Sequence, residues 1–309
     1  MKVCVLTGGI GSEREVSIQS GNCVAEGLEK GGVNVVVADI TPENTEILRA
    51  DDIDVFFIAL HGKFGEDGQL QQILEDRGLL YTGSGPGASK QAFDKIVSKK
   101  IFAERGIRTP AAIEFGKESD AGEVEKQLEG LGDKYVVKPV TQGSSVGVSI
   151  IERCGEVTAA SRKCLGEFGD CMIEEFIAGR EITVGIFCGE ALPIIEVRPE
   201  REFYDYDAKY VDEQTGFLFD TIESGELSEQ IKSAAIECYN ALGCRHFARV
   251  DLILCGDGSF YVLELNTIPG LTTHSLVPKA AARAGLSMSD LCVKIVEAAL
   301  EEKCSVVQG

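Results

Sequence analysis

The segment RVDLILCGDGSFYVLELN, residues 249–266, predicts two antiparallel strands joined by a tight turn. The turn is Gly256-Asp257-Gly258-Ser259, and apolar and polar residues alternate on both sides of it. Pairing outward from this turn gives two sets of opposed residues, because side chains alternate between the faces of a strand. One face carries the pairs Cys255–Phe260, Ile253–Val262, Asp251–Glu264 and Arg249–Asn266, and the other carries Leu252–Leu263 and Val250–Leu265. The second face is expected to be core, and the first ends in two facing carboxylates.

Directly opposed side chains have Cβ atoms about 4.5–5.5 Å apart, so two carboxylates in this arrangement repel unless a cation lies between them. Oxygen ligands from Asp251, Glu264 and Asn266 suit magnesium, which keeps several waters and is often shared with substrate phosphates. Arg249 beside them would stabilise charge on a transferring phosphoryl group. The alternative is an ordinary solvated hairpin in which Arg249 bridges the two acids.

The composition indicates a globular chain with several domains. Its 309 residues are 44% hydrophobic and 26% charged, enough for two or three domains of ordinary size. The formal net charge of −20 disfavours nucleic acid and anionic membranes as partners, and an anionic nucleotide needs a local positive cradle. No apolar run approaches the roughly 20 residues that span a bilayer, so a cytoplasmic location is expected. The 11 cysteines lack any CxxC pair and are expected to be reduced and mostly buried.

The hydrophobic pattern predicts a parallel α/β unit followed by α+β units. In the first unit the predicted strands are 3–7, 33–38, 55–60 and 79–82, with helices at 15–30 and around residues 70–74. A helix over 89–104 then leads to strands at 135–138, 146–151 and 172–176 and a helix at 157–168. The rest has strands at 181–187 and 192–197, a polar loop at 198–221, and helices at 226–242, 276–283 and 287–302 beside the hairpin. A loop of that length in a compact domain is usually functional or disordered.

Two glycine-rich stretches are candidates for phosphate binding. Lys138 ends a predicted strand, and Gln142-Gly-Ser-Ser-Val-Gly147 follows, where backbone N–H groups can approach phosphate oxygens. The spacing is not that of a Walker loop, so a plain glycine hairpin stays open as the alternative, and Lys95 alone is equally compatible with a solvated helical lysine. In residues 8–12, GGIGS resembles a dinucleotide turn, but Arg14 stands where a third glycine is required; the turn can equally expose Glu13 to a cleft.

In their order and spacing, these pieces resemble the D-alanine–D-alanine ligases of the ATP-grasp superfamily over essentially the whole chain. The segments that carry the resemblance are GSEREVSIQSG (11–21), HGKFGEDGQLQ (61–71), YTGSGPGAS (81–89), DK (94–95), VVKPVTQGSSVGVS (136–149), FYDYDAKY (203–210), RVDLIL (249–254) and LELNTIPGLTTHSLVP (263–278). The resemblance implies an ATP-grasp fold of three domains: an N-terminal α/β domain over 1–90, a central α+β domain over 91–178 and a C-terminal α+β domain over 179–309. ATP would lie between the last two.

By matched position, the resemblance implies the residues that bind nucleotide and metal. Lys95 and Lys138 would contact phosphates, and the loop from Gly143 to Gly147 would close over them. The complete set implied for ATP is Lys95, Lys138, Gly143, Ser144, Ser145, Val146, Glu174, Glu175, Phe176, Ile177, Glu181, Phe203 and Lys209. Glu175 departs from the lysine that many relatives carry there. Asp251, Glu264 and Asn266 match the ligands of Mg²⁺ or Mn²⁺, with two ions expected and a monovalent cation as a further possibility.

For the amino acids, the resemblance implies that Glu13 receives the first substrate's ammonium and forms a hydrogen-bonded group with Ser144 and Tyr210. His61 would lie on the same side, although a lone His after a strand is more often structural. Ser275 and Leu276, at a helix N-terminus, would bind the second substrate's carboxylate. Arg249 and the N–H of Gly270 would cover the developing oxyanion.

The implied reaction is transfer of the γ-phosphoryl group of ATP to D-alanine, followed by attack of a second D-alanine on the acyl phosphate, for peptidoglycan precursor synthesis. The loop bearing Phe203, Lys209 and Tyr210 would exclude water as a lid. A homodimer without nucleic acid or membrane partners is expected. The alternatives are a D-alanine–D-lactate type ligase, against which Tyr210 argues, and a non-catalytic ATP-binding protein, against which the intact metal residues argue.

Overall fold

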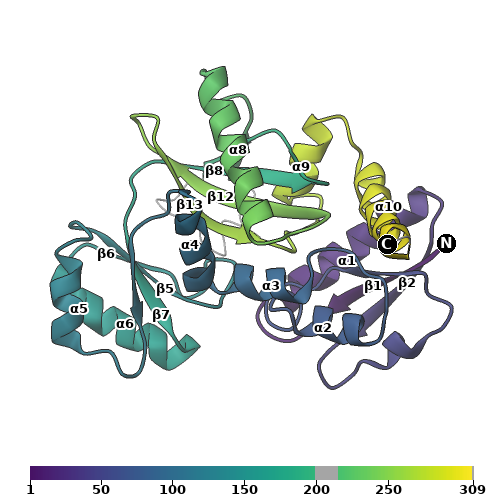
Figure 1. The fold of residues 1–309 in the computed structure, drawn as a ribbon, viewed down its shortest axis with the longest axis horizontal. Helices are drawn as coiled ribbons and strands as arrows, with labels where there is room; N and C mark the ends of the chain where they lie inside the picture. The colour runs from purple at the N-terminus through teal and green to yellow at the C-terminus, as the bar shows by residue number, and fades with distance from the viewer. Residues whose placement is uncertain (199–214, 308–309) are drawn as a thin grey trace.

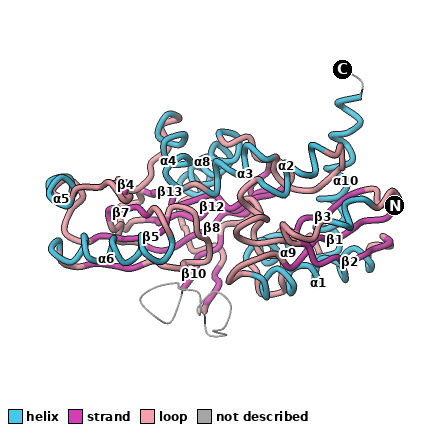
Figure 2. Tube along the Cα trace, turned by 90° about the horizontal axis from the view of Figure 1, so that it is seen from below, coloured by secondary structure: helices cyan, strands magenta, loops and turns pink. Residues whose placement is uncertain are grey.

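The computed structural model describes residues 1–198 and 215–307, which form three sheets and the helices that cover them (Figure 1). Each sheet is built from one continuous stretch of chain. The sheet that contains β8, β12 and β13 lies between the other two in Figure 1, and the view from below in Figure 2 agrees. The mixed α/β architecture with an N-terminal parallel sheet confirms the predicted fold class.

The N-terminal sheet is parallel, with strand order β2-β1-β3. Its elements are β1 (Lys2–Gly8), α1 (Arg14–Lys30), β2 (Asn34–Ile40), the 3-10 helix η1 (Glu46–Arg49), β3 (Val55–Ile58) and α2 (Gln69–Asp76). Alternate residues of β1 enter different cores, as the period of a strand requires. Val3 and Val5 pack with α1 and the C-terminal helix α10 (Met288–Val307), whereas Cys4 and Leu6 pack with α2. The last helix of the chain thus completes the core beneath its first strand.

The central sheet is antiparallel, with strand order β4-β7-β5-β6. Its elements are β4 (Ala112–Phe115), α5 (Ala121–Leu128), β5 (Tyr135–Pro139), β6 (Ser149–Ile151), α6 (Cys154–Phe168) and β7 (Cys171–Glu175). β4 and α5 were not predicted from the sequence. β6 begins three residues later than predicted, because residues 146–148 belong to the glycine-rich loop.

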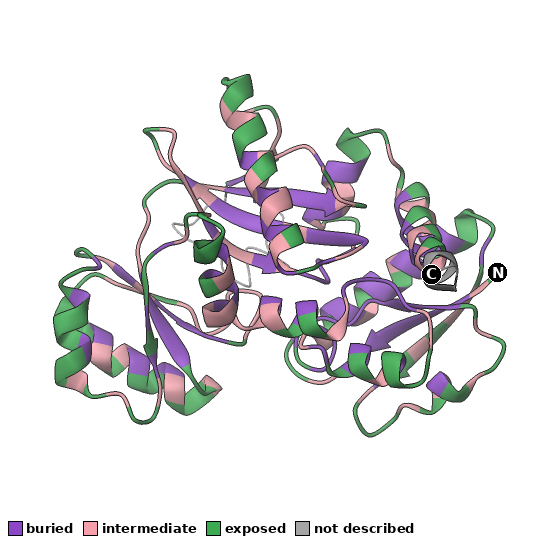
Figure 3. Ribbon diagram, viewed as in Figure 1, coloured by how far each residue is buried: buried purple, intermediate pink, exposed green. Residues whose placement is uncertain are grey.

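The third sheet has strand order β11-β10-β8-β12-β13, with β9 paired to β8. Its elements are β8 (Arg180–Phe187), β9 (Glu190–Ala191), β10 (Ile195–Arg198), β11 (Gly216–Leu218), α8 (Gly225–Ala241), β12 (Phe247–Leu254), β13 (Phe260–Asn266) and α9 (Leu276–Arg283). β10 pairs with β11, so the predicted 198–221 loop leaves the sheet at Arg198 and returns at Gly216 on a neighbouring strand. Figure 3 shows these strands mostly buried and the outer helix faces exposed.

Other predicted elements were also wrong in their extent. The single helix over 89–104 is two helices, α3 (Pro86–Phe93) and α4 (Lys95–Glu104), because Asp94 is extended and its carboxylate accepts hydrogen bonds from the N–H groups of Ile96 and Val97. The strand predicted over 79–82 is reduced to an isolated parallel bridge between Tyr81 and Phe56.

The hairpin register was predicted correctly at its outer end and wrongly near the turn. Arg249–Asn266, Val250–Leu265 and Asp251–Glu264 are paired as predicted, but a β-bulge after Asp251 pairs Leu252 with Val262 and Leu254 with Phe260. Val262 therefore enters the core, and Leu263 lines a cavity on the side of Glu264. A bulge adds one residue to one strand, which the alternation of residue types does not reveal.

Among the described residues, no helix is long and apolar enough to cross a membrane. The cysteines in the same part of the chain are free, and most of them are buried, as the sequence predicted.

Candidate active site

Two adjoining cavities of about 760 and 530 Å³ lie along the third sheet. The residues that line both are Lys95, Gln142, Glu181, Val197, Asp251 and Glu264. The two carboxylates predicted from the hairpin therefore lie where the cavities meet.

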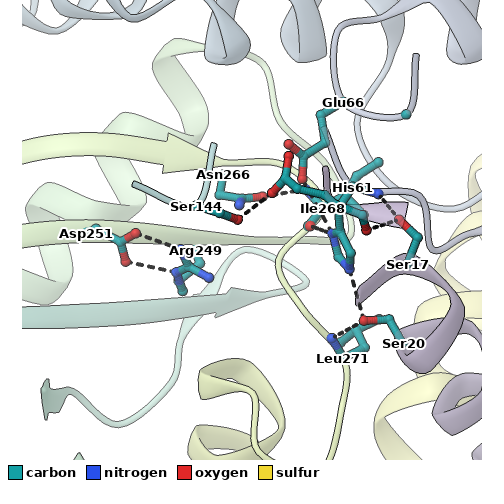
Figure 4. A network of polar contacts seen from close by, with 12 residues as sticks. Ser17, Ser20, His61, Glu66, Ser144, Arg249, Asp251, Asn266, Ile268 and Leu271 are labelled. Carbon is teal, nitrogen blue, oxygen red and sulfur yellow. Dashed lines mark hydrogen bonds and ion pairs between the residues drawn. The ribbon is translucent and has the colours of Figure 1, made fainter. Parts of the chain in front are cut away.

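Each of these carboxylates has a basic partner. Arg249 holds Asp251 with two parallel hydrogen bonds, Nε to Oδ1 at 2.8 Å and Nη2 to Oδ2 at 2.7 Å (Figure 4). The Thr183 hydroxyl, on the neighbouring strand, donates to the same Oδ1 at 2.7 Å. Glu264 lies 3.2 Å from the ammonium of Lys95, which also donates to the carbonyl of Gln142 at 2.6 Å. Arg249 thus pairs with Asp251, and Lys95 pairs with Glu264.

The donor set at this point suits a divalent cation. Among the described residues no three His, Cys, Asp or Glu side chains gather as a metal site, and the predicted set has two acids and one amide. The amide oxygen of Asn266 accepts one hydrogen bond, from the N–H of Ile268 at 2.9 Å, which leaves a second lone pair. Oxygen ligands of this kind, beside cavities on both sides, fit magnesium or manganese shared with a substrate.

The glycine-rich loop closes on Glu13. Ser144 donates its hydroxyl proton to Glu13, and a Cβ at Gly143 would lie 3.2 Å from the same carboxylate. Ser144 and Ser145 have φ of 54° and 58°, a left-handed conformation that serine rarely adopts and that indicates a constrained loop. Burial raises the pKa of Glu13, with the charge of Glu66 adding to the effect, and Ser144, His61 and Lys95 oppose it. Gly143 and Ser144 line the larger cavity, whereas Glu13 lies behind them and lines neither cavity.

His61 is held in a chain of hydrogen bonds behind the same wall (Figure 4). Its Nδ1 lies 2.9 Å from the carbonyl of Ile268, which only accepts, so Nδ1 carries the proton. Nε2, 2.9 Å from the Ser20 hydroxyl, accepts in the neutral imidazole, and Ser20 in turn accepts from the N–H of Leu271. His61 thus joins α1 to the segment after β13, 3.6 Å from the carboxylate of Glu66.

The smaller cavity is lined by apolar side chains and by Lys95 and Lys138. Its apolar lining consists of Val197, which also lines the larger cavity, and of Pro110, Val136, Pro139, Val146, Val148, Phe176, Ile177, Ile253 and Leu263. Glu175 and Glu181 also line it, and the N–H groups of Glu175 and Phe176 bond to the carbonyls of Ala111 and Lys134.

Glu174, also in this cavity, is 2% exposed and lies between two lysines. Its Oε2 is 2.6 Å from Lys138 and its Oε1 is 2.5 Å from Lys99. Burial alone would raise the pKa of Glu174, but Lys138 and Lys99 outweigh it and hold that pKa below the usual range.

The start of α9 faces the larger cavity, which Ser275, Leu276 and Gly270 line. The Ser275 Oγ accepts from the N–H of Thr272 at 3.0 Å and does not cap α9, so the first N–H groups of the helix have no side-chain cap. Among the described residues, the N–H of Gly270 has no hydrogen-bond acceptor either. These are donors for an anion.

Most of the predicted site residues therefore gather around the two cavities. Phe203, Lys209 and Tyr210 lie outside the described residues. The sequence reasoning missed Lys99, Thr183 and Glu66. Lys99 stands one helical turn after Lys95, and Glu66 lies inside a quoted motif; both signals were available in the sequence. Nothing in the sequence alone pairs Thr183 with Asp251.

Comparison with known proteins identifies one family over nearly the whole chain. Residues 101–297 match the family model described as "D-ala D-ala ligase C-terminus", and residues 43–84 match "D-ala D-ala ligase N-terminus". A D-alanine–D-alanine ligase of Anaeromyxobacter sp. (strain K) is 41% identical over 303 residues, covering 96% of both chains.

Two solved structures extend the comparison. The D-alanine–D-alanine ligase of Bacillus anthracis complexed with ATP has a TM-score of 0.87 at 40% identity, covering 99% of this chain and 98% of that one. A D-Ala:D-Ser ligase of Enterococcus faecalis has a TM-score of 0.84 at 27% identity, covering 96% and 99%. With its family models, its full-length relatives and its fold in agreement, the chain belongs to the D-alanine–D-alanine ligase family of the ATP-grasp superfamily.

Proposed function

We propose that this chain joins two D-alanine molecules into D-alanyl-D-alanine with ATP and a divalent cation. The observation that carries the proposal is that Asp251 and Glu264 line both cavities. The smaller cavity has apolar side chains and lysines, and the larger one has the N-terminus of α9. A phosphoryl group delivered from the first cavity would meet a carboxylate held in the second at this junction.

The smaller cavity suits ATP. Its apolar walls would hold the adenine between the central and C-terminal sheets, with Glu175, Phe176, Ile177 and Glu181 at its edge. Lys95 and Lys138 would contact the phosphates, under the loop of Gly143, Ser144, Ser145 and Val146. Phe203 and Lys209, which lie outside the described residues, remain part of the proposed set.

Asp251, Glu264 and Asn266 would hold Mg²⁺ or Mn²⁺, with two ions proposed. Such ions would neutralise charge on the phosphates during transfer. Arg249, fixed by its two bonds to Asp251, would lie beside the reacting group and stabilise the developing oxyanion together with the N–H of Gly270.

In the larger cavity, Glu13 would receive the ammonium of the first D-alanine and Ser275 and Leu276 the carboxylate of the second. Glu13 would reach the ammonium only if its bond to Ser144 and the loop wall shift, since it lies behind Gly143 and Ser144. Tyr210, outside the described residues, would complete this hydrogen-bonded group. His61 would fix the segment that carries Gly270.

The same proposal includes a cytoplasmic role in peptidoglycan precursor synthesis, a homodimer, and domains at 1–90, 91–178 and 179–309. Each of the three sheets falls within one of these ranges, which supports the division.

The test is ADP release with magnesium and a panel of D- and L-amino acids and D-lactate, with products identified by mass. Release of ADP with D-alanine alone, and a dipeptide product, is the expected result. A depsipeptide with D-lactate as the preferred product would favour the ester-forming alternative. ATP binding without turnover of any amino acid would favour a non-catalytic ATP-binding protein.

A further inference from the structure

At the wall of the smaller cavity, three charged side chains are buried together. Glu174 on β7 contacts Lys138 on β5 at 2.6 Å and Lys99 on α4 at 2.5 Å. The side chains are 2%, 9% and 8% exposed, respectively. Lys138 and Glu174 line the cavity, but Lys99 lines neither cavity. Lys99 is therefore placed to act on a bound nucleotide only through its neighbours.

Helix α4 carries two lysines one turn apart, and each contacts a carboxylate that lines the smaller cavity. Lys95 extends to Glu264 on β13, and Lys99 extends to Glu174 on β7. The bonds from the N–H groups of Ile96 and Val97 to Asp94 fix where the helix begins, and with it the direction of both lysines. In Figure 1, α4 lies between the central sheet and the sheet that contains β13.

The count of charges explains why a second lysine is needed at Glu174. With Lys99 present, the group of Lys99, Lys138 and Glu174 carries one net positive charge. Without Lys99, Lys138 and Glu174 would form a neutral pair, and Lys138 would stay bound to the carboxylate instead of meeting phosphates. In a chain of net charge −20, a lost local cation is not replaced by a general positive field.

We propose that Lys99 is a positioning residue for ATP: it holds and neutralises Glu174, so that Lys138 keeps its charge for the phosphates. This inference rests on the proposed use of ATP. Burial and the charge of Lys138 lower the pKa of Lys99, and the contact with Glu174 opposes that effect.

The test is a double-mutant cycle of Lys99→Met, Glu174→Gln and the combined variant, read out by calorimetric binding of ADP with magnesium and by the kinetics with ATP. Lys99→Met is expected to weaken ADP binding and raise KM for ATP by about 10-fold, the loss typical of a charge-assisted contact, with kcat within about 3-fold. Against the Glu174→Gln background, the same change is expected to alter affinity by less than about 3-fold, because no carboxylate remains to hold Lys138.

Two further variants separate charge from structure. Lys100→Met alters an exposed neighbour on the same helix and is the matched control. Lys99→Gln keeps a hydrogen-bond donor for Glu174 without a charge, and is expected to weaken ADP binding as much as Lys99→Met does. Melting temperatures without nucleotide report whether each variant is folded; if Lys99→Met is not, Lys99→Gln and the combined variant carry the test.

The outcomes are distinct. Equal loss of affinity from Lys99→Met with and without Glu174→Gln would overturn the inference, as would unchanged affinity in both Lys99 variants. Failure of the unaltered protein to bind ADP or ATP with magnesium would instead refute the proposed function.

Discussion

Two pairs of carboxylates can be compared near the larger cavity: Asp251, Glu264 and Glu66 line it, and Glu13 lies behind its wall. Asp251 and Glu264 are each matched with a basic side chain, Arg249 and Lys95. Glu13 and Glu66 have as their closest polar partners a hydroxyl, from Ser144, and an imidazole, from His61. The first pair lies on a hairpin in the sheet, and the second lies on segments that flank the N-terminal sheet.

The partners indicate which cation each pair is suited to accept. Asp251 and Glu264 lie where the two cavities meet, and each already contacts a basic side chain. A metal ion could bind there beside Arg249 and Lys95 or in place of one of these contacts. Glu13, buried beside a second acid, has a raised pKa and gains most from a new positive group such as a substrate ammonium. The difference teaches that acids close to one cavity are suited to different ligands because their partners differ.

The largest effect is expected at the first pair. Glu264→Gln or Asp251→Asn is expected to weaken magnesium activation by about 100-fold or more, because changes merely next to metal ligands already cost about 10–100-fold. The measurement is activity against magnesium concentration at fixed ATP, with circular dichroism to confirm the fold. Asp257→Asn, an exposed acid in the turn of the same hairpin, is the control. Magnesium dependence equal to that of the unaltered protein would remove these residues from the metal site.

At the second pair, Glu13→Gln is expected to raise KM for the first D-alanine by about 10–100-fold, the value of one charge-assisted hydrogen bond. The amide oxygen can still accept from Ser144, so the loop is retained while the charge is lost. Initial rates at varied D-alanine, with Glu15→Gln as an exposed control on the same segment, give the result. A KM shift confined to ATP would contradict the assignment.

The raised pKa of Glu13 also predicts a pH dependence. Protonated Glu13 cannot pair with an ammonium, so KM for the first D-alanine is expected to rise as pH falls through this raised pKa, and the rise should be absent in Glu13→Gln. The effect of Glu13 on the free energy of unfolding has the opposite pH dependence to that of a salt-bridged acid. Because its pKa is higher in the folded state, ionised Glu13 destabilises the fold, and stability falls as pH rises through that pKa. Glu13→Gln should therefore melt higher than the unaltered protein at neutral pH and lose this advantage below pH 4.5, the ordinary value. Thermal melts across pH test this, and a constant difference would contradict it.

The smallest effects test the bulge beside Glu264. Val262→Ala removes a core side chain and is expected to cost about 1–2 kcal/mol of stability, with little effect on ATP affinity. Leu263→Ala removes a cavity wall and is expected to weaken ATP binding a few-fold, with the smaller loss of stability. Denaturant unfolding and ADP binding separate the two. If Leu263→Ala caused the larger loss of stability and Val262→Ala weakened ADP binding, the strand pairing without a bulge would be correct.

The sequence predicted the longer strands because they have clear hydrophobic patterns, and it missed the short strands β4, β9 and β11. It predicted the Asp251–Glu264 pair because the turn is short. It misplaced Val262 and Leu263, because a bulge depends on how β13 meets its neighbours; the N–H of Val262, for example, bonds to the carbonyl of Arg108. It joined α3 to α4 because Asp94 looks like any helical surface acid until its side chain is seen to cap the second helix.

For the site, motifs and resemblance located most of the candidate residues, but not their partners. Lys99 and Thr183 contact Glu174 and Asp251 across elements that are far apart in the chain, and such contacts follow from packing rather than from spacing. The placing of His61 on the side of the first substrate stays a prediction; its observed hydrogen bonds are with Ser20 and Ile268.

The packing of α10 against the first strand has a consequence for synthesis on the ribosome. Val3, Val5 and Phe57 share one core with α1 and with Leu291 and Ile295 of α10, so one face of the N-terminal sheet stays only partly covered until the last helix has been made. At about 5–20 residues per second, that wait is on the order of 10–50 s. During it the growing chain exposes part of the apolar surface that α10 later buries.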